Sequence, residues 1–152
     1  LAEKQKMRYY YGLMEKQFRG IYEKAIRRRG VTGEIMLQIL ETRLDSVVYS
    51  LGFGYTRAQA RQMVTHGHVL VNGKRARTPS IAMNEGDKVE IKHTEKSRHL
   101  ADKNLEYSTS RTVPEWLEVD KAAYTGSVKR KPTREDIEPV ANEQTIVEFY
   151  SR

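Results

Sequence analysis

The sequence of 152 residues predicts an α+β fold, in which helices come first and two short helices then lead into a small, mostly antiparallel sheet. Three observations predict this order. Apolar residues recur every three or four positions through much of residues 1–65, which is the period of one helix face. The pair Asn72-Gly73 follows, a strong hairpin signal because both residues tolerate positive φ. Residues 88–92 alternate charged and apolar side chains, as a half-exposed strand does.

The first predicted helical region covers residues 1–29, and Gly12 interrupts it. Its inward positions share the helical spacing: Met7, Tyr11, Met14, Phe18, Ile21, Tyr22 and Ala25. Cations at both ends of the region are candidate phosphate contacts: Lys4, Lys6 and Arg8, then Arg27, Arg28 and Arg29. The second group has an alternative role, since cations near a helix C-terminus interact favourably with the helix dipole. The next helix begins near Thr32.

Two short helices are predicted next. The first carries apolar residues at helical spacing over residues 40–51 and ends at Gly52, because glycine adopts a left-handed conformation at little cost. Thr56 opens the second helix, and Gln59 follows three residues later at the spacing of a capping box. Gly67 ends this helix, and the hairpin follows.

Arginines on the second of these helices adjoin further cations in the hairpin. Arg57 and Arg61 are four residues apart and face away from the core, where guanidinium groups can fork onto phosphate oxygens. Lys74, Arg75 and Arg77 come directly after the hairpin turn. Arginines on a helix often form only a solvated face, but a helix face and an adjoining loop of one sign form a basic patch. The patch favours nucleic-acid binding.

Four further side chains in this stretch have more than one interpretation. Arg43 and Asp45 form a local ion pair at the helix start or, through the arginine, a nucleic-acid contact, and both interpretations stay open. His66 and His68 flank Gly67 and suggest a metal site. We exclude a metal there, because no cysteine and no further histidine lies nearby to complete a ligand set. No cofactor is expected.

After residue 92 the sequence becomes more polar. Residues 93–98 predict a basic connector, residues 100–107 a short helix and residues 114–119 a brief apolar strand. Trp116, the single tryptophan, is predicted to lie in the core and not to stack on a base. Residues 126–134 read GSVKRKPTR and predict an extended, exposed segment. Its cations are either phosphate contacts or part of a solvated loop: Lys129, Arg130 and Lys131.

The composition limits the classes of function. Lys and Arg number 27 against 20 Asp and Glu, which gives a net charge of +7 and a pI near 9.6 and predicts attraction to a polyanion. The length suits one or two small domains and not a large enzyme. Without cysteine or a long apolar run, thiolate chemistry, a spanning helix and a signal peptide are not expected. The cytosol is the expected compartment, and Leu1 in first position suggests a natural N-terminus upstream.

The order of motifs over residues 43–74 resembles the RNA-binding module named after small-subunit ribosomal protein S4. The residues that carry the resemblance are Arg43-Leu44-Asp45, Thr56-Arg57, Ala60-Arg61-Gln62, His66-Gly67-His68 and Val71-Asn72-Gly73-Lys74. The module also occurs in synthetases, RNA-modifying enzymes and stress proteins, so the flanks decide the family. The flanks resemble bacterial S4 ribosomal proteins in Glu3-Lys4-Gln5-Lys6, Tyr11-Gly12-Leu13, Glu15-Lys16-Gln17-Phe18, Lys129-Arg130-Lys131-Pro132 and residues 146–152. The resemblance therefore covers nearly the whole chain.

This resemblance implies how the domains are arranged. In the family the last apolar stretch returns to pack on the first helices, so residues 1–40 and 126–152 are expected to form a discontinuous helical domain. Residues 41–125 are then an inserted RNA-binding domain, with its core module at about 41–105. The resemblance and the basic patch together predict these RNA-binding residues: Lys4, Lys6, Arg8, Arg43, Thr56, Arg57, Arg61, Gln62, His66, His68, Asn72, Gly73, Lys74, Arg75, Arg77, Lys129, Arg130 and Lys131.

The resemblance further implies a structural ribosomal protein that is not an enzyme. The expected partner is small-subunit ribosomal RNA, bound directly at a multi-helix junction in its 5′ part. The expected roles are nucleation of subunit assembly and a contribution to translational accuracy. Neighbouring small-subunit ribosomal proteins are further partners, some members repress their own messenger RNA, and no membrane partner is expected. Family members usually begin with an extension, in some cases carrying a cysteine-bound zinc, and this chain starts without it.

Two alternative functions differ from this expectation. Arg43-Leu44-Asp45 resembles the Arg-Leu-Asp of pseudouridine synthases, whose aspartate is catalytic and which can carry the same module. Those enzymes need a large catalytic domain outside the module, and the remaining residues are too few to form one. The second alternative is a free RNA-binding translational repressor, which would not reside on ribosomes.

Overall fold

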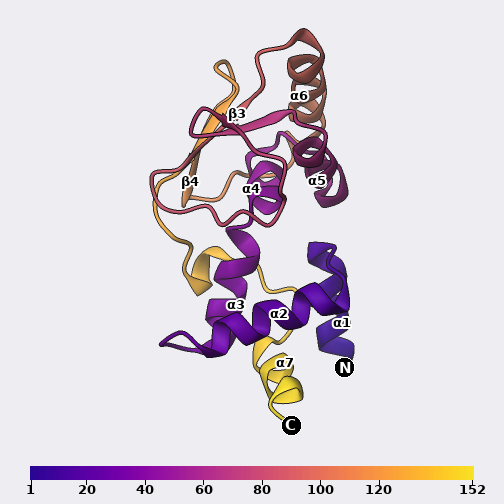
Figure 1. Ribbon diagram of the computed structural model, residues 1–152, viewed down its shortest axis with the longest axis vertical. Coiled ribbons are helices and arrows are strands. Elements are labelled where there is room, and N and C mark those ends of the chain that lie inside the picture. Colours follow the sequence, from indigo (N-terminus) through magenta and orange to yellow (C-terminus); the bar gives the residue numbers. More distant parts are fainter. The chain divides into compact units, whose positions relative to one another are not determined.

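The computed structural model describes residues 1–152 and contains both helices and a sheet (Figure 1). There are seven α-helices, one short 3₁₀ helix and five β-strands. They form two compact units, one of residues 1–41 with 132–152 and the other of residues 42–131. The predicted α+β class is confirmed.

The first unit is helical and takes its elements from both ends of the chain. They are α1 (Ala2–Tyr11), α2 (Glu15–Ile26), α3 (Thr32–Glu41), the 3₁₀ helix η1 (Arg134–Asp136) and α7 (Glu143–Tyr150). Gly12 ends α1 with φ 69°, a left-handed conformation that glycine adopts without the clash a Cβ would cause. The predicted interruption at Gly12 therefore separates two helices.

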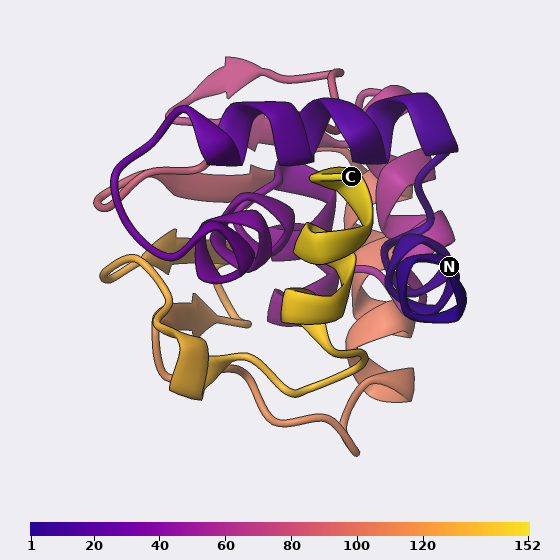
Figure 2. The same ribbon diagram turned by 90° about the horizontal axis from the view of Figure 1, so that it is seen from below.

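The C-terminal helix α7 completes the core of the first unit. Figure 2 shows α7 among α1, α2 and α3. Ile146 is 1% exposed, and burial of such a side chain contributes about 1.5–3 kcal/mol. The Tyr150 ring stacks on the Tyr22 ring of α2, with ring centroids 4.8 Å apart. The last apolar stretch thus packs on the first helices.

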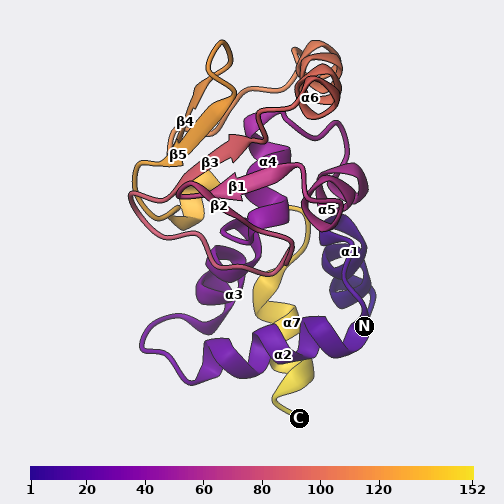
Figure 3. The ribbon, with the colours of Figure 1, turned by 45° about the horizontal axis from the view of Figure 1, so that its top comes forward.

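The second unit combines three helices with a five-stranded sheet. Its elements are α4 (Leu44–Leu51), α5 (Arg57–Thr65), β1 (Val69–Val71), β2 (Lys74–Arg75), β3 (Lys88–Ile91), α6 (Glu95–Tyr107), β4 (Leu117–Asp120) and β5 (Thr125–Val128). The strand order is β2-β1-β3-β5-β4, and every neighbouring pair is antiparallel (Figure 3). The core joins the apolar faces of the helices to the sheet and includes Leu44, Val64, Ile91 and Trp116. The prediction that Trp116 is a core residue is confirmed, since it is 0% exposed.

The hairpin has the predicted turn. Asn72 has φ 51° and Gly73 has φ 81°, the positive values of a primed two-residue turn. The turn pairs Val71 with Lys74 and Leu70 with Arg75. Because side chains alternate along a strand, this register brings the hairpin cations to a defined place at the edge of the sheet.

Two expectations about the C-terminal half need correction. The expected boundary between residues 125 and 126 falls inside β5, which pairs with β3 and β4, and the change of unit comes between Lys131 and Pro132. Residues 126–134 were expected to be exposed, but Gly126 is buried. A Cβ atom at this position would lie 2.5 Å from Leu51, so the glycine lets β5 pack closely on α4.

The basic connector expected at residues 93–98 is also incorrect beyond its first two residues. The helix α6 starts at Glu95, five residues before the expected start at residue 100. The Thr94 hydroxyl accepts the Ser97 backbone N–H at 3.2 Å and so caps the helix. The apolar pattern alone missed this first turn, because its side chains are mostly polar.

Candidate nucleic-acid interface

The second unit carries most of the excess positive charge of the chain. Residues 42–131 hold 16 Lys and Arg against 10 Asp and Glu, a net charge of +6. Residues 1–41 and 132–152 hold 11 against 10, a net charge of +1. Which cations can meet a polyanion depends further on their burial and on the acids beside them.

Thr56 fixes the start of α5. Its hydroxyl accepts the Gln59 backbone N–H at 3.0 Å, and the Gln59 side-chain oxygen accepts the Tyr55 backbone N–H at 2.7 Å. This is the predicted capping arrangement, with the returning bond one residue further out. The Thr56 hydroxyl is therefore used to cap the helix that begins at Arg57. Gln62, on the same helix, is exposed.

Arg43, Asp45 and Arg61 form a charged network at the start of α4. Arg43 donates to both Asp45 carboxylate oxygens at 3.1 Å, and these side chains are only 9% and 5% exposed. Arg61 donates to the same carboxylate at 3.4 Å but is 34% exposed. The Ser46 backbone N–H adds a bond to the carboxylate at 2.8 Å. Of the two interpretations of Arg43, the structure favours the local ion pair, while Arg61 still reaches the surface.

Arg57 and Arg111 share the ring of Tyr49. The guanidinium carbon of Arg57 lies 4.6 Å from the ring centroid and that of Arg111 lies 3.9 Å from it. Arg57 also donates to the Ser46 hydroxyl at 3.0 Å. Arg111 donates to the carbonyl oxygens of Tyr49 and Gly54 at 2.8 and 2.9 Å. This role of Arg111 was not predicted, because its partners lie 62 and 57 residues away along the chain.

The hairpin cations are the most accessible of the predicted set. Lys74, Arg75 and Arg77 are exposed, and no acidic side chain is paired with any of them. The Arg77 guanidinium lies over Gly67, where a Cβ atom would be only 3.2 Å from one of its nitrogens. Glycine at this position, with φ 80°, thus leaves room for Arg77 at the end of α5.

Asn72 and Gly73 shape the hairpin that presents these cations. The Asn72 side chain donates to Asp87 at 3.0 Å and accepts the Lys88 backbone N–H at 2.9 Å. These bonds tie the turn to the start of β3. Gly73 is exposed and supplies the second positive φ of the turn. The side chain of Asn72 therefore has a structural role that the resemblance alone did not indicate.

The two histidines of the module differ in their surroundings. His66 is exposed, whereas the His68 ring nitrogen Nδ1 lies 2.7 Å from the Ser97 hydroxyl. Burial lowers the pKa of His68, and the positive charges of Lys96, His66 and Lys92 lower it further. The lowered pKa favours the neutral ring of His68 at physiological pH. Lys92 and Lys96, which the motif search did not single out, add positive charge near it.

In the first unit, the predicted contacts of α1 are paired with acids. The Lys4 ammonium lies 2.8 Å from the Glu15 carboxylate, and its side chain is 8% exposed. Arg8 lies 3.9 Å from the same carboxylate. Lys6 is exposed but lies 3.6 Å from Glu3. Lys4 is thus buried and paired with an acid, which leaves it less available to RNA than the expectation assumed.

Two exposed basic segments remain, one in each unit. In the first unit, Arg27, Arg28 and Arg29 follow α2 and are all exposed. In the second unit, Lys129 and Lys131 are exposed and Arg130 is half-buried. The Lys129 backbone N–H donates to the Trp116 carbonyl at 2.9 Å, which holds the start of the second segment against the core. Both segments can offer cations to a polyanion.

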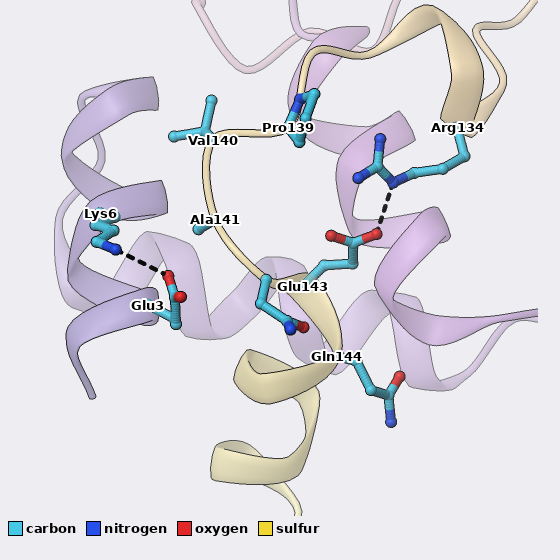
Figure 4. A pocket seen from close by; sticks show the side chains of 9 residues that line it. Glu3, Lys6, Arg134, Pro139, Val140, Ala141, Glu143 and Gln144 are labelled. Carbon is cyan, nitrogen blue, oxygen red and sulfur yellow. Dashed lines mark hydrogen bonds and ion pairs between the residues drawn. The ribbon is translucent and has the colours of Figure 1, made fainter.

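A cavity of about 530 Å³ lies in the first unit, between α1 and the segment that leads into α7 (Figure 4). Its charged side chains pair with one another, Glu3 with Lys6 at 3.6 Å and Arg134 with Glu143 at 2.6 Å.

Nowhere in the chain are three His, Asp or Glu side chains grouped so that they could hold a metal ion. None of the helices combines the length and apolar character needed to cross a bilayer.

The small antiparallel sheet, its packed helices and the unpaired cations of its hairpin define an RNA-binding class of protein. Residues 42–89 match the S4 domain family, and residues 1–41 match the ribosomal protein S4/S9 N-terminal domain family. The chain is 51% identical over 152 residues to small ribosomal subunit protein uS4 of Akkermansia muciniphila and 53% identical over 152 residues to that of Opitutus terrae. Each match covers 100% of this chain and 75% of the relative.

A third relative, uS4 of Geotalea daltonii, is 53% identical over 154 residues, which covers 100% of this chain and 73% of the relative. The chain belongs to the uS4 family of small ribosomal subunit proteins. The resemblance found in the sequence motifs is thereby confirmed, for the flanks as well as for the module.

Proposed function

We propose that this chain is a structural protein of the small ribosomal subunit that binds ribosomal RNA directly through its second unit. The observation that supports this proposal most strongly is the hairpin, where three cations are exposed and form no ion pair: Lys74, Arg75 and Arg77. The unit that carries them has a net charge of +6. Each cation that neutralises a phosphate releases condensed counterions, so these side chains favour binding to any RNA backbone. Family membership supports ribosomal RNA as the target.

The contacts divide the predicted RNA-binding residues into two groups. Exposed or half-exposed groups are proposed to meet RNA: Lys6, Arg8, Arg57, Arg61, Gln62, His66, Lys74, Arg75, Arg77, Lys129, Arg130 and Lys131. The others are proposed to hold the surface in shape: Lys4, Arg43, Thr56, His68, Asn72 and Gly73. In this proposal residues 42–131 act as the RNA-binding domain.

The proposed mode of recognition is the shape of the RNA. Side chains cannot read the deep, narrow major groove of A-form RNA, so a folded basic surface meets phosphates and 2′-hydroxyls instead. A multi-helix junction in the 5′ part of the small-subunit RNA presents many backbone groups at once. Binding there would nucleate assembly of the subunit body, and a place beside neighbouring ribosomal proteins would affect translational accuracy. The proposed location is the cytoplasmic ribosome.

A salt titration tests the hairpin assignment. The variant Lys74→Ala with Arg75→Ala is compared with the control Lys103→Ala with Lys121→Ala, which removes two exposed cations outside the hairpin. Affinity for a small-subunit RNA fragment is measured over a range of salt concentrations. Loss of two phosphate contacts should reduce the slope of log affinity against log salt by about 1.4–1.8, and the control should keep the parent slope. Equal slopes in all three proteins would contradict the proposal.

Gradient fractionation separates the ribosomal role from a free repressor of translation. A ribosomal protein sediments with small subunits at moderate salt, whereas a repressor stays near the top of the gradient. Repression of its own messenger RNA by the unassembled protein is compatible with the first outcome.

No catalytic role is proposed for Asp45 of the Arg-Leu-Asp motif. Asp45 is 4% exposed, and its carboxylate is bound by Arg43, by Arg61 and by a backbone N–H. A catalytic carboxylate must instead reach its substrate within hydrogen-bonding distance.

A further inference from the structure

Two tyrosines that no motif explains form an exposed pair on the second unit. Tyr55 is 50% exposed and Tyr107 is 55% exposed. Their ring centroids are 5.4 Å apart, and the ring planes meet at 56°. Tyr55 lies just before α5 and Tyr107 is the last residue of α6, so the fold brings them together from distant parts of the sequence.

The backbone beneath this pair is fixed by hydrogen bonds. The Tyr55 N–H donates to the Gln59 side chain at 2.7 Å. The buried Asn104 side chain, one turn before Tyr107, donates to the Phe53 carbonyl at 2.9 Å. The first bond ties Tyr55 to α5, and the second joins the end of α6 to the loop before α5. The backbone that carries the two rings is therefore ordered before a ligand binds. A ligand that stacks on the rings loses little affinity to ordering of this backbone.

Two arginines lie close to Tyr55. Arg111 donates to the carbonyl of Gly54 at 2.9 Å, and Arg57 is the second residue after Tyr55. Proteins that bind single-stranded nucleic acid combine cations that meet the backbone with aromatic rings on which bases stack. A protein partner would instead favour a surface with little charge at its centre.

We propose that Tyr55 and Tyr107 form a stacking platform for unpaired bases of RNA. This site rests on the proposed RNA-binding function and adds to it a preference for single-stranded segments next to the phosphate contacts. Because every base has an aromatic face, the platform accepts bases of different sequence.

Matched substitutions test the platform. One variant carries Tyr55→Leu and Tyr107→Leu, which keeps apolar side chains but removes the rings. The control carries Tyr55→Phe and Tyr107→Phe, which keeps the rings. Binding to a single-stranded oligoadenylate and to a short blunt RNA duplex is measured by fluorescence anisotropy at one salt concentration. The Leu variant should bind the single strand at least about fivefold more weakly, the Phe variant within about twofold of the parent, and both should bind the duplex as the parent does.

The outcomes distinguish the inference from the function on which it rests. A parent chain that bound neither RNA would overturn the proposed function itself. A parent chain that bound RNA together with an unchanged Leu variant would overturn only the platform and leave the pair as a contact for another protein. Equal loss in the Phe and Leu variants would assign the effect to the hydroxyl groups and also overturn stacking. If the Leu variant unfolds, nuclear magnetic resonance of the parent decides, because stacked adenines must shift the ring protons of both tyrosines.

Discussion

The two units hold their cations in different ways. In the first unit, α1 carries Lys4 and Arg8, and both lie beside the single carboxylate of Glu15. In the second unit, Lys74 and Arg75 of the hairpin form no ion pair with an acidic side chain. The net charges, +1 and +6, follow the same division. We infer that a basic residue is most available to RNA where the fold leaves it without an internal acid.

The largest expected effect concerns the buried carboxylate of the second unit. Asp45→Ala removes the partner of Arg43 and leaves a guanidinium that is only 9% exposed. An uncompensated buried charge costs about 3–5 kcal/mol of unfolding free energy. In the first unit, Glu15→Ala should cost only about 1–2 kcal/mol, because the carboxylate is 47% exposed. The Lys4 ammonium that it leaves behind still lies 5.0 Å from the Phe149 ring centroid and 5.9 Å from that of Tyr150.

Urea unfolding measures both losses, and Trp116 fluorescence follows the second unit because this unit holds the only tryptophan. The exposed acid Glu118 provides a control, since Glu118→Ala should change the free energy by less than about 0.5 kcal/mol. Equal losses for Asp45→Ala and Glu15→Ala would contradict the contrast between a buried and an exposed acid.

The next largest effect comes from close packing of β5 on α4. In Gly126→Ala the added Cβ would lie 2.5 Å from the Leu51 side chain, so the strand or the helix must move. Such overpacking typically costs about 1–3 kcal/mol. The cost should appear in the Trp116 transition. Unchanged stability would mean that Leu51 moves aside freely, and the glycine would then have no packing role.

Local rules of the chain allowed much of the fold to be predicted. The stop at Gly52, the cap at Thr56 and the turn at Asn72-Gly73 each depend on residues within a few positions, and the structure has all three. The core position of Trp116 was predicted from its neighbours Leu117 and Val119, which are apolar and not cationic, and it is confirmed.

The use of each cation was harder to predict, because partners distant in sequence decide it. Lys4 meets Glu15 only after α1 and α2 pack together. Arg111 finds the carbonyls of Tyr49 and Gly54 only in the folded unit. Rules based on residue spacing within one helix or strand cannot predict these contacts. The charged residues could therefore be listed from the sequence, but not sorted into buried pairs and free cations.

The pH dependence of stability should also differ between the units. In the second unit, the folded pKa of His68 lies below that of the unfolded chain because of burial. The Thr94 hydroxyl donates to Ser97 at 2.8 Å, which directs the Ser97 proton toward His68 Nδ1 and favours the neutral ring. The unfolded chain then binds the proton more readily, so stability present above about pH 6.5 is lost as the pH falls below that value.

In the first unit the corresponding group is Glu15. Burial raises its pKa, but hydrogen bonds from Lys4 and Tyr150 and the charges of Lys4 and Arg8 bring the pKa below its usual value. Its contribution is therefore present above about pH 4.5 and lost at more acidic pH. Urea unfolding at several pH values separates the two, with Trp116 fluorescence for the second unit and far-ultraviolet circular dichroism for the helices. His68→Gln should remove the loss near pH 6 and leave the acidic loss in place.

The smallest expected effect is a gain of stability in the first unit. Gly20 lies inside α2, and no atom lies within 4 Å of a Cβ built there. Alanine restricts the unfolded chain more than glycine does, so Gly20→Ala should stabilise the protein by about 0.5–1 kcal/mol. The same substitution is therefore expected to have opposite signs at Gly20 and Gly126, although both glycines have ordinary backbone conformations. Thermal unfolding of the two variants tests this prediction. A lower melting temperature for Gly20→Ala than for the parent would contradict it, because the Cβ atom has free space in the structure.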